Sequence, residues 1–324
     1  MTDQDNVVEI EPADDDEEEA SPAYDLSNIN SLIELFKAET ADGTKPYISA
    51  HIKSLIDSHG LSDYEVIFLY DESNSIQDFH SNKIYNAVSE INNNKDILLI
   101  LLSQGGKIEP AYLISKTCKR LCKDRFVIAI PRRAKSAATL ISLGADELHM
   151  GLLSELGPID PQIGGFPALG LANALERIAT LAEQHPGASE VFSKYLINKL
   201  ELKDLGYFER INESAGQYAE RLLAGKVFPD GKSSKELASH FVNHYKDHSF
   251  VIDTDEASSL LGDGFIKEGT AEYKFSNDIY QFIDFLTFLY PLFFKKNMRY
   301  VGNVGDGIDL SDKEESFNRV ARGL

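Results

Sequence analysis

The sequence is poor in cysteine, with two in 324 residues, Cys118 and Cys122. They lie four positions apart on an expected helix, so they share one face, and the partners that a zinc site needs are missing. This pattern predicts reduced thiols in a cytoplasmic protein. No cofactor motif or nucleotide-binding loop occurs either, so we expect neither a metal nor a cofactor.

Long apolar runs are also missing. The N-terminus lacks the basic and apolar pattern of a secretion signal, so we do not expect secretion. The most membrane-like stretch, Ile279–Phe294, is interrupted by Asp284 and Pro291. It is shorter than the roughly 20 apolar residues that a span requires. We expect a buried or subunit-interface helix there rather than a membrane-spanning one.

Basic residues are scarce: 32 Lys and Arg stand against 52 Asp and Glu, a net charge of -20. The excess is uneven, because residues 1–20 hold ten Asp or Glu and no Lys or Arg. Such a segment has nothing to bury, which predicts a disordered acidic tail. The sign of the charge disfavours nucleic acid as a partner.

Short, fully apolar runs alternate with helical periodicity in the middle of the chain. The expected strands are Val66–Tyr70, Ile97–Leu102, Phe126–Pro131 and Glu147–Met150, and the expected helices are Ile76–Ile91, Ile108–Leu121 and Ser136–Leu143. The pattern predicts an α/β fold with a parallel sheet covered on both faces. Ligands bind beyond the carboxyl ends of such strands. The loops at 103–106 and 131–136 lie at those ends and should meet.

Four segments follow from this pattern. They are the acidic tail (1–20), a peripheral helical segment (21–62), a catalytic domain (63–270) and a C-terminal helical and aromatic segment (271–324) that is a possible oligomer contact. After Gly151 the pattern becomes mostly helical, and 250–266 predicts a strand, a short helix capped by Thr254 or Asp255, and a last strand.

The two loops carry the chemistry. Gly105 and Gly106 expose backbone N–H groups that suit an anion, although a glycine pair is also a common turn. Ser136 suits either an N-cap or a nucleophile at a helix start. Three cations, Arg132, Arg133 and Lys135, precede that helix, where the helix dipole disfavours them, which predicts a negatively charged partner at this turn.

These motifs together resemble a known family. Gln104-Gly-Gly106 after a strand, about 30 residues before a helix-starting serine, looks like the Clp-protease/crotonase fold. Ala134–Leu148 is similar to the corresponding segment of signal peptide peptidase A. Gly157–Gln162 and His248–Ala257 look like the serine dehydrogenase proteinase family. The resemblance covers roughly residues 64–267 and implies strand–helix units with helical additions at both ends.

Carried over by position, the resemblance implies that Ser136 is the nucleophile. The N–H groups of Gly106 and Ala137, with Gly105, would form the oxyanion hole. An extended peptide groove would be lined by Gly157, Pro158, Ile159 and Asp160.

The general base is the open point. Clp proteases use a histidine about 25 residues after the serine, where this chain has Asp160 and no histidine. Relatives of signal peptide peptidase use a lysine from the following helical region, which works only if burial lowers its pKa. We favour Lys199 for its apolar neighbours. The alternatives are Lys203, Lys194 and His248.

The sequence therefore predicts a cytoplasmic serine endopeptidase that cleaves extended or unfolded polypeptide and assembles as a homo-oligomer. Two other functions remain open. One is a catalytically silent peptide-binding or scaffold protein with the same fold. The other is a crotonase-type acyl-CoA enzyme with Glu155 as its carboxylate.

Overall fold

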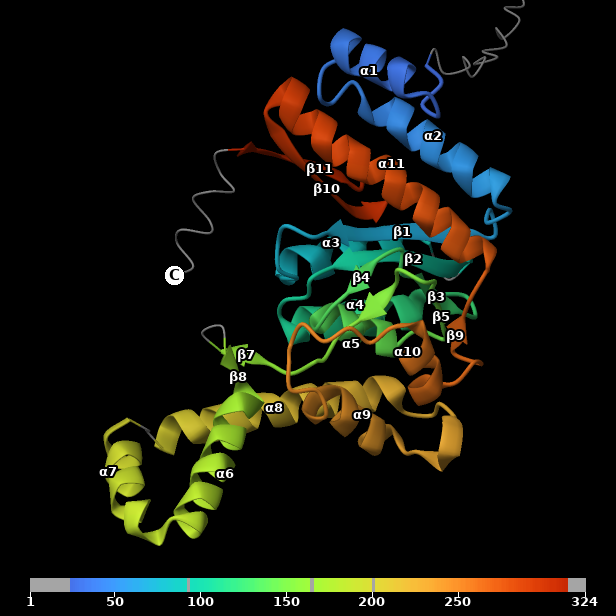
Figure 1. Cartoon of the computed structure of the whole chain (residues 1–324). Coiled ribbons are helices and arrows are strands. Elements are labelled where there is room, and N and C mark those ends of the chain that lie inside the picture. The colour runs from blue at the N-terminus through green and yellow to red at the C-terminus, as the bar shows by residue number, and fades with distance from the viewer. Residues whose placement is uncertain (1–23, 92–93, 164–165, 200–201, 314–324) are drawn as a thin grey trace, which may run out of the picture.

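A nine-stranded, mostly parallel sheet forms the centre of the structure (Figure 1). The computed structural model describes residues 24–91, 94–163, 166–199 and 202–313, so the expected acidic tail lies outside the described residues. The strand order is β11-β10-β1-β2-β3-β5-β9; off this path β4 pairs with β2, and β6 pairs with β4. The bounds are β1 Tyr64–Asp71, β2 Asp96–Ser103, β3 Phe126–Ala129, β4 Arg133–Ala134, β5 Glu147–His149, β6 Glu155–Leu156, β9 Ile266–Lys267, β10 Lys296–Asn303 and β11 Ile308–Asp312.

The central strands β1, β2 and β3 are largely apolar because both faces of the sheet are covered. In β1, Ile67 and Leu69 point into one core, whereas Val66 and Phe68 point into the other. Parallel pairing runs from β1 through β2, β3 and β5 to β9. This confirms the parallel sheet and the α/β class that the sequence predicts.

Helices from different parts of the chain cover the two faces. One face carries α3 Asp78–Ser89, α4 Ile108–Leu121, α5 Ala137–Leu143, α8 Leu202–Leu223, α9 Ser234–Asn243 and α10 Thr254–Leu261. The other carries α1 Ile29–Ala38, α2 Lys45–Ser58 and α11 Ala271–Phe294. The first of these layers includes α5, the helix that begins next to Ser136.

The N-terminal and C-terminal segments form one layer together. Leu35, Phe36 and Ile52 share a buried core with Ile283 and Tyr290 of α11. Much of the aromatic segment therefore has a partner within the chain, while Phe288 and Leu292 stay 61% exposed. After α11 the chain forms the antiparallel hairpin β10–β11, which extends the sheet beside β1 and which the sequence pattern did not reveal.

Two helices and a short hairpin precede α8 in the chain. Figure 1 shows α6 Ala168–Gln184 and α7 Ser189–Lys199 projecting from the body together with the start of α8. A short hairpin, β7 Gln162–Ile163 and β8 Phe166–Pro167, precedes them. Helix α10 is capped by Asp253, whose carboxylate accepts the Glu256 N–H at 3.0 Å, so Thr254 and Asp255 were the wrong choices for its cap. Among the described helices, none has the length and apolarity that a membrane crossing requires.

Candidate active site

The two loops singled out in the sequence touch at the carboxyl end of the sheet. Strand β4 pairs with the end of β2 through Ser103 and Ala134, and the Lys135 N–H donates to the Ser103 carbonyl at 3.0 Å. A Cβ placed on Gly105 would lie 2.8 Å from the Ser136 Cβ and 3.0 Å from the Ala137 nitrogen. Only glycine allows the two loops to approach this closely.

Ser136 has a backbone conformation that is unusual for a serine. Its φ is 51° and its ψ is -115°, outside the regions that L-residues prefer. It occupies the N-cap position of α5, but its hydroxyl makes no capping bond to the helix. Helix α5 is buried along its whole length, so the strain is held in place by packing. The N-cap explanation of this serine therefore fails, and its hydroxyl is left available.

Two backbone N–H groups beside Ser136 are also available. Within the described residues, the N–H groups of Gly106 and Ala137 have no acceptor. The Gly105 N–H differs, because it donates to Ser103 Oγ at 3.1 Å. Of the three expected oxyanion donors, Gly106 and Ala137 remain free in this conformation.

A histidine and a buried aspartate form a pair on neighbouring segments. His248 Nδ1 lies 2.7 Å from Asp160 Oδ1, and the Asp160 side chain is 3% exposed. The other carboxylate oxygen accepts from Gln162 Nε2 at 2.8 Å. A carboxylate only accepts, so Nδ1 carries the hydrogen and Nε2 of the neutral ring has a free lone pair. Sequence reasoning named both residues for separate roles and missed that they pair.

Lys135, which directly precedes Ser136, bonds to the segment that contains His248. Its ammonium lies 2.9 Å from Glu155 and donates to the carbonyls of Leu156 and Phe250, each at 3.1 Å. Phe250 follows His248 by two residues, and Lys135 directly precedes Ser136. The side chain is buried and has a partner for each of its three N–H bonds.

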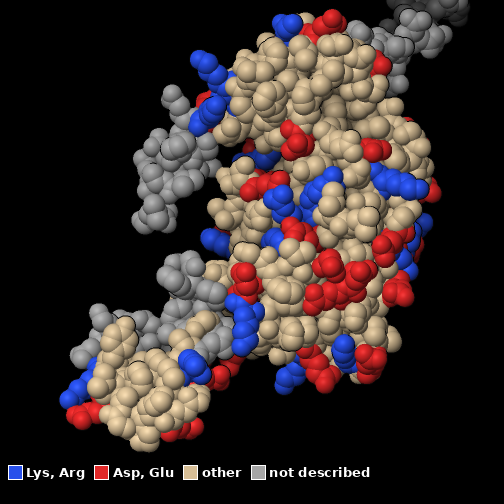
Figure 2. Space-filling view, in the orientation of Figure 1, with Lys and Arg blue, Asp and Glu red and all other residues tan. Residues whose placement is uncertain are grey.

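The other two cations at this turn have protein partners as well. Arg132 lies over the Tyr280 ring, 4.2 Å from its centroid, and donates to Asn277 at 3.0 Å. Arg133 lies 3.2 Å from Glu72 and 3.4 Å from Glu155. Figure 2 shows basic and acidic side chains alternating across the middle of the visible face. The negative partners of Arg133 and Lys135 are therefore carboxylates of the protein itself, whereas Arg132 contacts a ring and an amide oxygen.

The remaining predicted residues lie in three kinds of environment. Lys194 has a side chain that is 72% exposed and pairs with Glu190 at 2.8 Å. Lys199 lies in α7 and Lys203 in α8, but their side chains lie outside the described residues. The four residues expected to line a peptide groove, Gly157, Pro158, Ile159 and Asp160, are all buried.

Two backbone donors in that groove segment are already engaged. The Gly157 N–H donates to Thr139 Oγ1 at 3.0 Å, and the Ile159 N–H donates to the Phe241 carbonyl at 2.9 Å. This segment thus packs against α5 and α9 in the present conformation. Across the described residues, no group of three or more His, Cys, Asp or Glu side chains is arranged to hold a metal ion.

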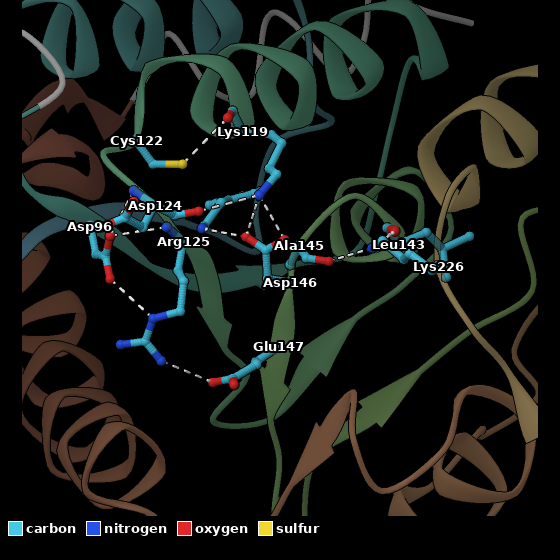
Figure 3. A network of polar contacts seen from close by, with 11 residues as sticks. Asp96, Lys119, Cys122, Asp124, Arg125, Leu143, Ala145, Asp146, Glu147 and Lys226 are labelled. Atoms are coloured by element: carbon cyan, nitrogen blue, oxygen red, sulfur yellow. Dashed lines mark hydrogen bonds and ion pairs between the residues drawn. The ribbon is translucent and has the colours of Figure 1, made fainter.

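The C-terminal end of α5 is held by a partly buried lysine (Figure 3). Lys226 follows α8 and donates to the carbonyls of Leu143 and Ala145, and its ammonium lies 4.3 Å from the centroid of the Phe265 ring. Burial lowers the pKa of this lysine to about 7. Lys119 and Asp146 form an ion pair nearby at 2.7 Å. The helix that starts beside Ser136 is therefore fixed at both ends.

Comparison with known proteins gives a family match and several similar proteins. Residues 67–199 match the family model of the ClpP-like SDH-type serine proteinases. The uncharacterized protein MJ0137 of Methanocaldococcus jannaschii is 29% identical over 65% of this chain and 64% of its own length. MJ1495 of the same organism is 28% identical over 58% of this chain and 61% of its own. The chain thus spans a little under two thirds of each relative.

Solved structures show a weaker likeness. ClpP1 from Listeria monocytogenes has 15% identity and a TM-score of 0.40, covering 68% of this chain and 98% of that one. A mutant of the membrane-bound stomatin-specific protease 1510-N, in complex with a substrate peptide, has 13% identity and a TM-score of 0.41. That match covers 78% of this chain and 89% of that one.

Proposed function

We propose that the chain is a serine endopeptidase with Ser136 as its nucleophile, a proposal supported by the match of residues 67–199 to the model of the ClpP-like SDH-type serine proteinases. One observation carries the assignment to Ser136. The residue is held at a φ of 51° against Gly105, and its hydroxyl is not used to cap the helix that it starts. Strain of this kind persists where the surrounding structure imposes it, and it is concentrated at functional sites.

We propose His248 as the general base, with Asp160 as the residue that orients it. The imidazole Nε2 takes the proton from Ser136 Oγ while Oγ bonds to the substrate carbonyl carbon. The carbonyl oxygen becomes an oxyanion that accepts from the N–H groups of Gly106 and Ala137. The proton then passes to the leaving nitrogen as the peptide bond breaks, and water releases the acyl group by the same route.

The choice of His248 over a lysine rests on the surroundings of each group. A histidine whose Nδ1 is fixed by a buried carboxylate presents Nε2 as an acceptor. A lysine acts as a base only where its ammonium is desolvated. Lys194 is exposed and paired with Glu190, which excludes it on this ground. Lys199 and Lys203 stay as competing hypotheses that the experiment below separates.

The proposed substrate is polypeptide in an extended or unfolded form, and the support for it is the family model that residues 67–199 match. The acyl-CoA alternative lacks such support. Its carboxylate would be Glu155, which is neutralised by Lys135 at 2.9 Å and by Arg133 at 3.4 Å. These two ion pairs already engage the carboxylate.

Covalent labelling tests the proposal. A fluorophosphonate probe should label the full chain at Ser136, and Ser136→Ala should abolish both labelling and peptide cleavage. His248→Gln should slow labelling by about 10²- to 10⁴-fold, the range for loss of a general base. His244→Gln is the matched control, since that histidine is exposed on the same segment.

Two outcomes would change the proposal. Labelling that survives His248→Gln but is lost in Lys199→Met or Lys203→Met would replace the histidine by a lysine base. Intact protein without any adduct at Ser136, together with retained peptide binding, would favour the scaffold function.

A further inference from the structure

The end of strand β1 carries a buried aspartate–histidine pair that the proposed mechanism does not use. The side chains of Asp71 and His80 are each 2% exposed, and His80 Nε2 lies 3.2 Å from Asp71 Oδ2. The other ring nitrogen, Nδ1, accepts the Gln77 N–H at 3.1 Å. Nε2 therefore carries the ring hydrogen and donates it to the carboxylate. This pair fixes the start of α3 relative to the end of β1.

The same carboxylate closes the turn that follows β1. Asp71 Oδ1 accepts from the N–H groups of Ser73 at 3.2 Å and Asn74 at 2.9 Å. A cation arrives from the C-terminal hairpin, where Arg299 of β10 lies 3.8 Å from Asp71 Oδ2. The Arg299 guanidinium also lies 4.0 Å from the centroid of the Phe79 ring and pairs with Asp309. A buried carboxylate with this many donors holds its turn in one conformation.

That turn leads to Ile76, whose backbone clamps the glycine loop. The Ile76 N–H donates to the Gly105 carbonyl at 2.8 Å, and the Ile76 carbonyl accepts from the Lys107 N–H at 2.9 Å. Gly106 lies between these two bonds, and a Cβ on it would be 2.2 Å from the Ile76 nitrogen. The direction of the free Gly106 N–H is therefore set by the position of Ile76.

We propose that Asp71, His80 and Arg299 are positioning residues that hold the Gly106 N–H in place as an oxyanion donor. The inference rests on the proposed peptidase function. The C-terminal hairpin lies outside the family-matched region 67–199. Through Arg299 it would help to position an oxyanion donor. An oxyanion donor acts on charge that develops in the transition state, so a displaced donor lowers kcat and leaves ground-state binding nearly unchanged.

The test is Asp71→Asn in the full chain, assayed with a peptide substrate and a peptide boronic acid that mimics the tetrahedral state. The asparagine side-chain oxygen can still accept from the turn N–H groups. Its NH₂ group, however, would face the N–H donors of His80 or Arg299, so those contacts would be lost. The expected result is a fall in kcat of at least about tenfold with KM changed less than about twofold. The affinity for the boronic acid should fall by the same factor as kcat/KM. Asp312→Asn, on the exposed pair with Lys296 of the same hairpin, is the control and should change neither.

A second variant guards against loss of folding. Arg299→Lys keeps the positive charge but loses the planar contact with Phe79, and it should move kcat in the same direction by a smaller factor. The inference would be overturned if kcat were unchanged in both variants. It would also be overturned if the substrate and the boronic acid lost affinity equally while kcat was retained. In either case, fluorophosphonate labelling of the unmodified chain at Ser136 would still support the peptidase function. An unmodified chain that does not react at Ser136 would overturn both.

Discussion

Replacing Gly105 by alanine tests the contact on which the candidate site depends. The added methyl would lie 2.7 Å from the Lys135 carbonyl oxygen and 2.8 Å from the Ser136 Cβ, at a φ of 102°. The backbone conformation costs about 1–3 kcal/mol for a residue with a Cβ. Overpacking against backbone atoms that cannot rotate away adds about 1–3 kcal/mol. We therefore expect the free energy of unfolding to fall by about 2–6 kcal/mol.

Gly60→Ala is the matched control for this change. Gly60 also has a positive φ, 70°, but a Cβ there meets nothing within 4 Å. The free energy of unfolding of Gly60→Ala should fall only by the cost of the left-handed backbone conformation, about 1–2 kcal/mol. The difference between the two variants measures the contact between the loops and not the general cost of replacing a glycine.

Activity separates the two variants further. The methyl group of Gly105→Ala pushes the glycine loop away from Ser136, which displaces the Gly106 donor. Loss of one oxyanion donor costs about 10²- to 10³-fold in kcat. Unfolding in urea followed by circular dichroism gives the stabilities, and fluorophosphonate labelling with peptide cleavage gives the activities. A Gly105→Ala protein as stable and as reactive as Gly60→Ala would refute the contact.

Three further changes test other parts of the structure. Burial lowers the pKa of Lys226 to about 7 in the folded state. Above pH 7 this lysine is therefore neutral in the folded chain but still protonated in the unfolded chain. The stability of the unmodified chain relative to Lys226→Met, measured by urea unfolding, should therefore rise between pH 7 and 10, by up to about 1.4 kcal/mol per pH unit. A difference that does not change with pH would contradict this, and Lys53→Met at an exposed position is the control. Lys135→Met should lower the free energy of unfolding by about 1–3 kcal/mol, because the carbonyls of Leu156 and Phe250 lose their donor while Glu155 keeps Arg133. It should also slow labelling of Ser136, and an unchanged labelling rate would show that Lys135 does not position the serine. Arg132→Lys should cost about 0.5–1 kcal/mol through the Tyr280 stack and leave KM for acidic and neutral peptides equal, whereas a selective rise in KM for acidic peptides would show that this cation recruits substrate.

The sequence was most informative where a local pattern carries the structure. The helix Ile108–Leu121 has the predicted bounds, because its apolar positions recur with helical spacing. The apolar runs at β1 and β2 could be assigned to a covered parallel sheet for a similar reason. The hairpin β10–β11 escaped, since its strands exist through pairing with β1, as at Phe68 and Gly302. No local pattern within 296–312 indicates pairing with β1.

The candidate site divides in the same way. Ser136 and the glycine loop were found because each lies at the end of an expected strand, and the sheet brings such ends together. The His248–Asp160 pair joins residues 88 positions apart, and no periodicity connects them. The N–H of Gly105 was expected among the oxyanion donors, but the Ser103 hydroxyl takes it, a contact set by one rotamer. Such contacts depend on side-chain placement, which spacing does not encode.

The layer formed by α1, α2 and α11 determines whether the family-matched region could fold on its own. Residues 67–199 supply β2 and β3, but Phe68, Leu98 and Val127 face helices that come from outside that range. Cut out alone, the region would expose this apolar side of the sheet to water and would also lose His248. The two ends of the chain therefore cover one face of the central sheet, and a protein with only the matched residues would need another segment or subunit to bury that face.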